Sequence, residues 1–348
     1  MSGQYILGDT VDKFERSFAK YCGTKYCIGT NNGTMALAIA LLVVGVNAGD
    51  KVFVPTNSFI ATANAVRMIG AIPIFCDVDP STWVISLQSI QDTIKQFGYP
   101  KAIIPVHLFG IMANMTVIMN WALQHNVLVI EDACQAHGSF WNGKPAGSIG
   151  DAGCFSFYPT KSLGAYGEAG AIVTNSKEIY KQAISLRNNG ALSNNGMEKY
   201  IHPLFGYNAR ISQIQAAILS VKLRYLDKWI YTKKKIVDLY KSMILTPKIK
   251  MQDHYIENNT ISYHIFAIYS GDRSALMKNL FRHGIQCSIH YPVPIHQQEC
   301  YRGWPSTEQR LSYAEQLAQG ILSLPLYPEM RIDQVVHVAQ CINKFYGV

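Results

Sequence analysis

The sequence predicts an α/β protein in which a mostly parallel sheet has helices on both faces, forming three layers, and a smaller α+β domain follows. Short apolar runs alternate with helical segments over the first two thirds of the chain, and this rhythm is typical of βαβ units. The 348 residues are enough for one large and one small domain. We therefore expect the large domain over residues 1–243 and the small domain over residues 244–348.

Composition and charge exclude several classes of protein. Apolar residues make up 49% of the chain and charged residues 16%, which is typical of a globular domain rather than a disordered one. The net charge of +8 is spread along the chain, and its densest cluster, residues 233–235, is expected to be the solvated face of a helix rather than a nucleic-acid patch.

Targeting signals and membrane spans are also not evident in the sequence. The longest apolar run, residues 35–46, is shorter than the about 20 residues needed to cross a bilayer. The start lacks the basic and apolar regions of a signal peptide. The eight cysteines form no Cys-x-x-Cys pair, so we expect free thiols, no metal site and a cytoplasmic protein without membrane or nucleic-acid partners.

The first elements are an amphipathic helix over residues 10–22 and an apolar helix over residues 35–46. Gly33 and Thr34 stand at the start of the second helix. Unpaired N–H groups and the positive end of the helix dipole make such a position an anion site. Alternatively, Thr34 could act only as the N-cap of a core helix.

Strands and helices then alternate up to the middle of the chain. The expected strands are 51–54, 72–76, 102–106 and 127–130, and the expected helices are 58–69, 87–97 and 115–125. His107 follows the third of these strands, where it is either a hydrogen-bonded structural residue or part of a site. In the small domain we expect a strand-rich stretch at 261–269, a helix at 274–283, a strand at 286–290 and helices from about 307 and 332.

Two reactive side chains follow neighbouring strands of the predicted sheet. The buried run 127–130 delivers Asp132 to the carboxyl end of its strand, where open α/β sheets bind ligands. A short strand at 154–157 is followed by Lys161, which should reach the same edge. A lysine and a carboxylate in one crevice suit pyridoxal phosphate, because the amine can bond to the aldehyde while the carboxylate keeps the ring nitrogen protonated.

The same residues carry a family resemblance. Residues 131–138 read Glu-Asp-Ala-Cys-Gln-Ala-His-Gly, and residues 155–167 read Phe-Ser-Phe-Tyr-Pro-Thr-Lys-Ser-Leu-Gly-Ala-Tyr-Gly. Both resemble signature segments of the DegT/StrS family of fold-type-I pyridoxal-phosphate enzymes, which aminate nucleotide-linked keto sugars. The resemblance implies a PLP/PMP cofactor held by Lys161, which would also act as general base and acid, with Asp132 beside the ring nitrogen.

The resemblance implies further cofactor contacts. Gly33 and Thr34 begin a match to the family's Gly-Thr-x-Ala-Leu phosphate segment, and Ser156 is expected to bind the phosphate with them. Gln135 is expected to touch the phenolic oxygen of the cofactor. Phe59 matches an aromatic residue that stacks on the cofactor ring, although an aromatic residue near a helix start can also simply pack in the core.

A long polar loop and the segment after it indicate a second subunit. Residues 187–207 are polar and rich in glycine, and a loop of this length is more often functional than idle. The Gly-Tyr-Asn-Ala-Arg segment at 206–210 resembles a family segment whose asparagine reaches the phosphate of the neighbouring subunit's cofactor. The resemblance therefore implies a homodimer with shared active sites and assigns Asn208 to the cofactor.

Three residues are candidates for substrate contacts. His290 and Tyr291 belong to a stretch that resembles the family's His-Tyr-x-Pro-x-His segment near the sugar, and Arg210 follows Asn208. A lone histidine is more often solvent-facing or locally hydrogen-bonded, so this assignment depends on the resemblance.

The expected activity is amino transfer to a keto group of a nucleotide-diphosphate deoxysugar, with glutamate as donor. Some relatives carry histidine in place of the lysine and act as dehydratases, so Lys161 favours amino transfer. Residues 206–223, together with His202, resemble members that aminate C3, which favours a 3-keto-6-deoxyhexose over a 4-keto sugar. A non-catalytic regulatory member is an alternative. A nicotinamide oxidoreductase is a third one, although no Gly-x-Gly-x-x-Gly fingerprint is present in the phosphate segment.

Overall fold

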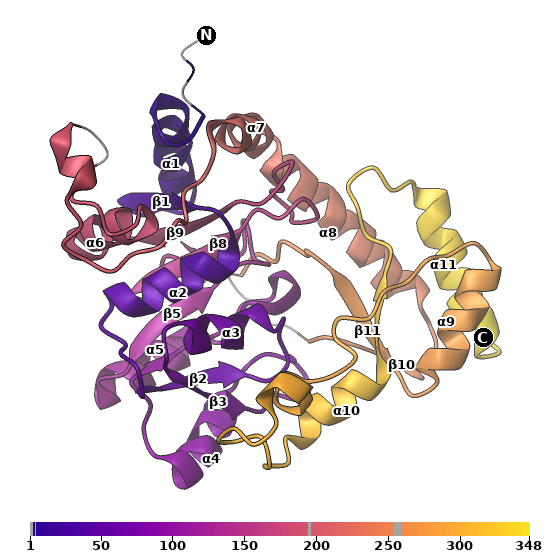
Figure 1. Ribbon diagram of the computed structural model, residues 1–348. Helices are drawn as coiled ribbons and strands as arrows, with labels where there is room; N and C mark the ends of the chain where they lie inside the picture. Colours follow the sequence, from indigo (N-terminus) through magenta and orange to yellow (C-terminus); the bar gives the residue numbers. More distant parts are fainter. Residues whose placement is uncertain (1–2, 4, 194–195, 254–258) are drawn as a thin grey trace.

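The protein is built around a seven-stranded, mostly parallel sheet in the order β1-β9-β8-β5-β4-β2-β3. The computed structural model describes residues 3, 5–193, 196–253 and 259–348. Strand β9 runs antiparallel to β1 and β8 on either side of it, and the remaining neighbours in this sheet pair in parallel. The strands are β1 Tyr26–Thr30, β2 Lys51–Pro55, β3 Ile72–Cys76, β4 Ala102–Ile103, β5 Leu128–Asp132, β8 Ala152–Ser156 and β9 Gly170–Thr174. The predicted fold class is confirmed (Figure 1).

Helices flank this sheet, and α1 to α5 lie near the ranges predicted from the sequence. They are α1 Asp9–Tyr21, α2 Gly33–Val43, α3 Ala61–Met68, α4 Leu87–Phe97, α5 Met115–His125, α6 Lys177–Arg187, α7 Gln213–Leu223 and α8 Leu226–Met243. Helix α2 is buried along almost its whole length, because it packs between the sheet and the helices α3 and α6; its sequence is apolar on every side for this reason. Among the described helices, none is long and apolar enough to span a membrane.

The N-terminus of α2 is capped by Asn32. Its Oδ1 accepts a hydrogen bond from the backbone N–H of Met35 at 2.8 Å, which satisfies one of the first-turn donors of the helix. The capping role considered for Thr34 therefore belongs to Asn32. Thr34 is the second residue of the helix and is partly exposed.

The C-terminal third forms a three-stranded antiparallel sheet with helices against it. Its strands are β10 Ile249–Met251, β11 Phe266–Ser270 and β12 Ile321–Leu324, and its helices are α9 Arg273–Arg282, α10 Ser312–Gly320 and α11 Ile332–Phe345. The strand predicted over 286–290 is wrong, since only Ser288 forms an isolated bridge, to Ser323 of β12. The short hairpin of β6 Phe140–Trp141 and β7 Lys144–Pro145 lies apart from both sheets.

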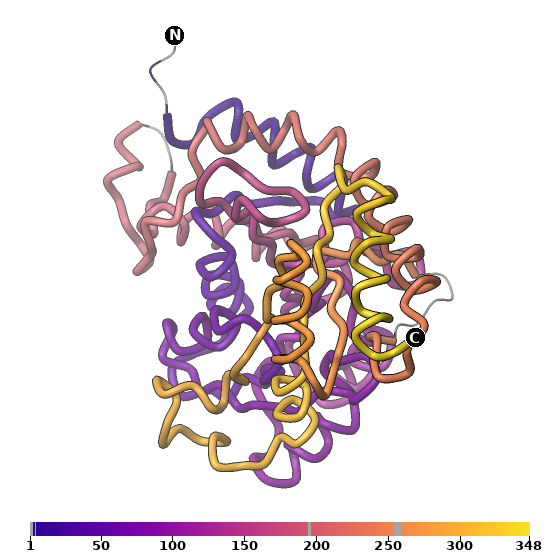
Figure 2. Tube along the Cα trace, turned by 90° about the vertical axis from the view of Figure 1, so that its right-hand side faces the viewer, coloured from indigo at the N-terminus to yellow at the C-terminus, as the bar shows by residue number. Residues whose placement is uncertain are grey.

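Helix α8 contributes side chains to two hydrophobic cores. Leu226 and Ile230 near its start pack into the core around the large sheet, whereas Ile236, Val237 and Tyr240 pack into the core around the small sheet. Figure 2 shows the second half of this helix running beside α11, against which it packs. A domain division after residue 243 stays a prediction, and α8 already enters the second core before that point.

Candidate active site

Strand β5 places Asp132 at the carboxyl edge of the large sheet. The side chain is buried, and its Oδ2 accepts a hydrogen bond from Oγ1 of Thr62 on α3 at 2.8 Å. Its Oδ1 accepts from the backbone N–H of Cys134 at 3.2 Å. Both donors are neutral, and none of the ion pairs within the described ranges includes Asp132. The negative charge is therefore available to a bound cationic group.

The residue before Asp132 fixes the end of this strand. Glu131 is fully buried, and its carboxylate accepts hydrogen bonds from the backbone N–H groups of Gly147, Ile149 and Gly150. The Nε2 of His107 lies 2.9 Å from Oε2 of the same carboxylate. His107 is therefore a buried structural residue, which decides between the two roles considered for it.

Lys161 lies in a turn that follows β8. Its backbone N–H donates to the carbonyl oxygen of Tyr158 at 2.8 Å. Strands β5 and β8 are parallel, with Asp132 opposite Cys154, so both strands deliver their following residues to one edge. Burial lowers the pKa of the Lys161 amine, while the carboxylate of Asp132 acts in the opposite direction. The amine is thus easier to deprotonate than an exposed lysine.

The N-terminus of α2 lies against the end of β8. A Cβ atom added at Gly33 would lie 2.8 Å from Cβ of Ser156 and 2.9 Å from Sγ of Cys134, so only glycine allows this approach. Gly33 and Ser156, which the sequence assigned to one phosphate site, are brought together here, and Thr34 directly follows Gly33 in the helix. First-turn N–H groups and a hydroxyl form a suitable cradle for an anion.

Gln135, Tyr291 and Phe59 form a second group at the same edge. The Oε1 of Gln135 accepts from the backbone N–H of Phe109 at 2.9 Å, and its Nε2 donates to the hydroxyl of Tyr291 at 3.2 Å. The rings of Phe59 and Tyr291 are 5.8 Å apart at their centroids, with Phe59 53% exposed. Phe59 is therefore not a core residue, which removes the packing alternative. Burial raises the pKa of Tyr291 to about 12, so its hydroxyl keeps its proton.

His290 borders the group from the C-terminal third of the chain. Its Nδ1 lies 2.8 Å from Oγ of Ser323 on β12. Burial lowers the pKa of His290, and the positive charge of Lys161 lowers it further. The imidazole is therefore easier to deprotonate than an exposed histidine.

Asn208 and Arg210 are not brought to this group. The Oδ1 of Asn208 accepts from Nη2 of Arg210 at 2.6 Å and from its Nε at 3.1 Å. Asn208 is exposed, and within the described ranges the side-chain hydrogen bonds of the two residues reach each other and Asn188 rather than Asp132 or Lys161. Their expected roles at a cofactor or substrate therefore need a partner subunit or another arrangement of the chain.

The residues present fit pyridoxal phosphate. A lysine with a lowered pKa suits the aldehyde, and a buried carboxylate that forms no ion pair among the described residues suits the protonated ring nitrogen. The cradle at Gly33 has no room for a side chain and offers donors to a phosphate. Each functional end of the cofactor thus has a matching group at one edge of the sheet.

A comparison with models of protein families decides the assignment. Residues 1–343 match the DegT/DnrJ/EryC1/StrS aminotransferase family. The chain belongs to this family. The recognition made from the two signature segments is confirmed.

Two relatives and one solved structure illustrate the relationship. The chain is 40% identical over 344 residues to the dTDP-3-amino-3,6-dideoxy-alpha-D-galactopyranose transaminase of Aneurinibacillus thermoaerophilus, covering 99% of this chain and 92% of the relative. It is 38% identical over 353 residues to the pleiotropic regulatory protein of Geobacillus stearothermophilus, covering 99% and 91%. The structure of NtdA from Bacillus subtilis with bound PMP aligns with a TM-score of 0.88 and 32% identity, covering 99% of this chain and 79% of that one.

These findings confirm the enzyme class and the cofactor. The protein is a pyridoxal-phosphate-dependent aminotransferase of the sugar-nucleotide class. As a member of the DegT/DnrJ/EryC1/StrS aminotransferase family it has the predicted fold, whereas the residues of its site stay predictions that the geometry supports.

Sequence reasoning missed two polar residues near the site. Thr62 hydrogen-bonds Asp132, and Lys233 is 4% exposed although the basic cluster was expected to be solvated. The expectation is wrong for Lys233 alone, since residues 234 and 235 are exposed. A periodicity signal was available, because Lys233 is three residues from Ile230 and from Ile236, both buried on the same helix.

Proposed function

We propose that this aminotransferase converts the keto group of a nucleotide-diphosphate-linked 3-keto-6-deoxyhexose to an amino group, with glutamate as the amino donor. The observation that carries the proposal is the meeting of Asp132, Lys161 and the Gly33 cradle at one edge of the sheet. A 4-keto sugar nucleotide is the alternative substrate.

Lys161 has two roles in the proposal. It holds the cofactor covalently between turnovers, and it moves a proton from and to the α-carbon of the amino donor as general base and acid. Its lowered pKa supports both roles, because a neutral amine is needed for attack and for proton abstraction. The bound cofactor supplies an electron-withdrawing ring that stabilises negative charge at the reacting carbon.

Asp132 is proposed to favour the protonated ring nitrogen of the cofactor. An opposite charge stabilises the charged form of a neighbouring group, and the neutral donor Thr62 leaves the charge of Asp132 uncompensated. Ser156 and the first N–H groups of α2 are proposed to hold the phosphate, which keeps the cofactor in place while its bond to the lysine is exchanged.

The remaining positions of the site are assigned to the ring and the sugar. Gln135, whose amide is oriented by the backbone of Phe109, is proposed to face the phenolic oxygen of the cofactor, and Phe59 to stack on its ring. Tyr291 and His290 border this space from the C-terminal third and are proposed to contact the sugar. Arg210 is proposed as a substrate contact from the partner subunit.

The relatives support a 3-keto substrate. One is named a dTDP-3-amino-3,6-dideoxy-alpha-D-galactopyranose transaminase, and another is named a UDP-N-acetyl-3-dehydro-alpha-D-glucosamine 3-aminotransferase. A GDP-perosamine synthase is also among the relatives, so the family includes other substrates. The name of the Geobacillus relative favours a regulatory function, but the presence of Lys161 and Asp132 after neighbouring parallel strands supports turnover.

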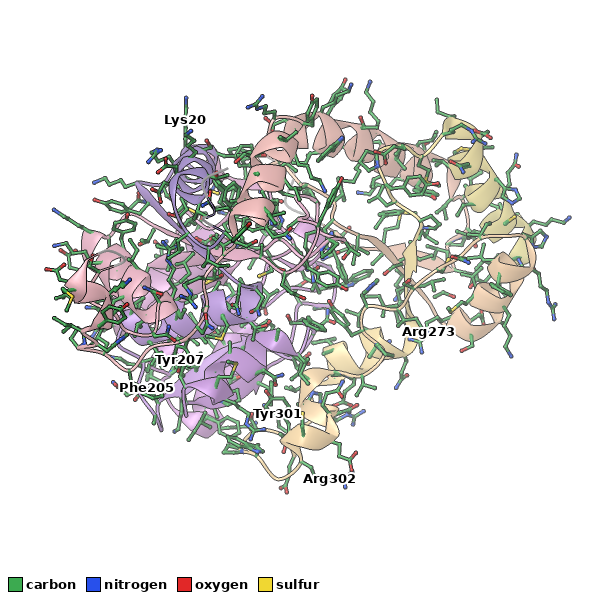
Figure 3. The ribbon with its side chains drawn as sticks, turned by 45° about the horizontal axis from the view of Figure 1, so that its top comes forward. Lys20, Phe205, Tyr207, Arg273, Tyr301 and Arg302 are labelled. Carbon is green, nitrogen blue, oxygen red and sulfur yellow. The ribbon has the colours of Figure 1, made fainter. Side chains whose placement is uncertain are left out.

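A second copy of the chain is proposed to complete the site. The loop before Asn208 exposes a group of apolar side chains, and such a group on a protein surface is typical of an interface with another protein. They are Leu192, Met197, Tyr200, Ile201, Leu204 and Phe205. Phe205 is 90% exposed and lies beside Tyr207 at the periphery of the molecule (Figure 3). A homodimer would bury this loop and could bring the exposed Asn208 to the phosphate of the partner's cofactor.

The substrate proposal is tested with matched keto sugars. The protein loaded with pyridoxal phosphate is incubated with glutamate and either the 3-keto or the 4-keto form of a dTDP-6-deoxyhexose, and NMR identifies the carbon that bears nitrogen. We expect amination at C3, and none with a Lys161→Ala protein. Nitrogen at C4 would establish the alternative substrate. Failure of glutamate to convert the cofactor to its amino form would instead support a regulatory protein.

A further inference from the structure

A buried lysine lies beside the turn that carries Lys161. The Nζ of Lys233 on α8 donates a hydrogen bond to Oγ of Ser162 at 2.8 Å, and Ser162 directly follows Lys161. Lys233 is 4% exposed, and the ion pairs of the described residues do not include it. A buried amine without a counter-ion is unfavourable for stability. Its contact with the catalytic turn therefore needs an explanation other than stability.

Helix α7 holds the residues that follow in the same turn. The Nζ of Lys222 donates to the carbonyl oxygen of Gly164 at 2.5 Å, and Oε1 of Gln215 accepts from the backbone N–H of Tyr166 at 2.8 Å. The two consecutive helices thus contact the segment after Lys161 at three points. Lys233 makes the contact nearest to Lys161 in sequence.

The place of Lys233 on its helix is also distinctive. Leu226 and Ile230 before it belong to the core of the large sheet, and Ile236 and Val237 after it belong to the core of the small sheet. Packing on both sides fixes this part of α8. Because the backbone of α8 is fixed at this position, a hydrogen bond from Lys233 can hold the turn at Ser162 in place.

We propose that Lys233 is a positioning residue for amino transfer, which holds the hydroxyl of Ser162 and thereby fixes the backbone from which Lys161 extends. The amine of Lys161 must reach both the cofactor's aldehyde and the α-carbon of the donor, and small errors of placement are costly for such reactions. Because its Nζ donates to Ser162, Lys233 acts through the backbone of the turn. The proposal rests on the role proposed above for Lys161.

The test measures how fast the cofactor-free protein attaches added pyridoxal phosphate covalently. The rate is followed by absorbance and by the mass of the borohydride-reduced protein, and kcat is measured separately from KM. We expect Lys233→Met and Ser162→Ala each to lower the attachment rate and kcat about tenfold with little change in KM. The double variant should be no slower than either single variant, since both changes remove one interaction.

Two matched variants serve as controls. Ser162→Thr keeps a hydroxyl and should retain the parental rate. If Ser162→Ala were slow only because packing is altered, Ser162→Thr would be slow as well. Lys235→Met makes the same substitution on the exposed side of α8 and should also retain it. Melting temperatures establish that each protein is folded.

Several results would overturn the inference. They are a parental attachment rate in Lys233→Met, effects of the two single variants that multiply in the double variant, or a loss in Ser162→Thr equal to that in Ser162→Ala. If Lys233→Met does not fold, Ser162→Ala and Ser162→Thr test the same hydrogen bond, because they change its acceptor instead of its donor. A Lys161→Ala protein that still attaches the cofactor would refute the role of Lys161 rather than that of Lys233.

Discussion

Asp132 accepts its hydrogen bonds from a threonine hydroxyl and a backbone N–H, both neutral. This arrangement holds the carboxylate in place without neutralising it. An aspartate paired with an arginine would be held as firmly but would offer little net charge to a ligand. The choice of neutral donors is what makes Asp132 suitable as the partner of a cationic ring.

Replacing Asp132 by asparagine tests this charge. Asp132→Asn keeps the shape and an acceptor for Thr62 but removes the negative charge, so we expect kcat to fall roughly 10²–10³-fold. Affinity for pyridoxal phosphate should fall far less, because the phosphate cradle is unchanged. Steady-state kinetics and a fluorescence titration measure the two quantities, with Asp92→Asn on the exposed face of α4 as control. Loss of affinity in proportion to kcat would contradict the assignment.

Lys233 predicts a pH dependence of stability. Burial lowers its pKa from 10.5 to about 7 in the folded protein. Between these values the unfolded chain binds more protons, so this residue makes stability rise with pH, and below about 7 its full penalty applies. Relative to Lys233→Met, we expect the parental free energy of unfolding to rise by about 1.4 kcal/mol per pH unit across this window.

Urea unfolding of both cofactor-free proteins across the window measures the difference. The nearby groups His137, His264 and Lys161 also have pKa values lowered by burial, but they are present in both proteins, so their contributions largely cancel. A difference between the proteins that does not change with pH would show that Lys233 keeps its ordinary pKa.

The placement of two site candidates could be predicted from strand position. Asp132 and Lys161 were expected at one edge because both follow apolar strands, and the structure pairs these strands in parallel. Thr62 and Lys233 were missed because their roles depend on which helix faces the site, which no local pattern states. Lys233 was predicted to be solvated because it belongs to a run of three lysines, although its spacing from Ile230 and Ile236 places it on the apolar face of α8.

At the scale of elements, the missing Cβ atom of Gly33 allows the start of α2 to lie close to Ser156 and Cys134. A Cβ at Gly33 would meet Cβ of Ser156 and Sγ of Cys134 at distances below 3.0 Å. Both neighbours lie at the carboxyl edge of the sheet, so any adjustment moves the segments that are proposed to hold the phosphate.

Gly33→Ala is therefore expected to lower both stability and cofactor affinity. Overpacking of this kind lowers the free energy of unfolding by about 1–3 kcal/mol, and the displaced α2 terminus should weaken binding of pyridoxal phosphate. Chemical unfolding and a cofactor titration measure the effects. Gly271→Ala, where no atom lies within 4 Å of the new Cβ, should change neither. Parental affinity in Gly33→Ala would show that the cradle lies elsewhere.

Element prediction succeeded for the periodic helix α1 and for strands β2, β3 and β5, and it failed for β12 and for residues 286–290. Helix α1 was found because its apolar residues recur at helical spacing. The strand β12 was missed, since four buried residues directly after a helix carry no alternation. Residues 286–290 were predicted as a strand from composition, yet they contribute only the bridge at Ser288. Pairing partners far along the chain decided both cases.

For the whole molecule, the proposed homodimer with shared active sites makes a prediction about hybrids. In a homodimer where Asn208 serves the partner's cofactor, a hybrid of Lys161→Ala and Asn208→Ala subunits has one site with both changes and one intact site. We expect such hybrids to recover about half of the parental activity per dimer, while each homodimer variant is impaired. Co-expression with two affinity tags isolates the hybrid. Sites built from a single chain would give no recovery.

The continuity of α8 has a consequence for how the protein unfolds. Eighteen residues of uninterrupted helix pass from one core into the other, where many two-domain proteins have a flexible linker. Neither core can unfold on heating without removing packing from α8. Scanning calorimetry should therefore record one endothermic peak for the cofactor-free protein, and two separated peaks would show that the two cores unfold independently.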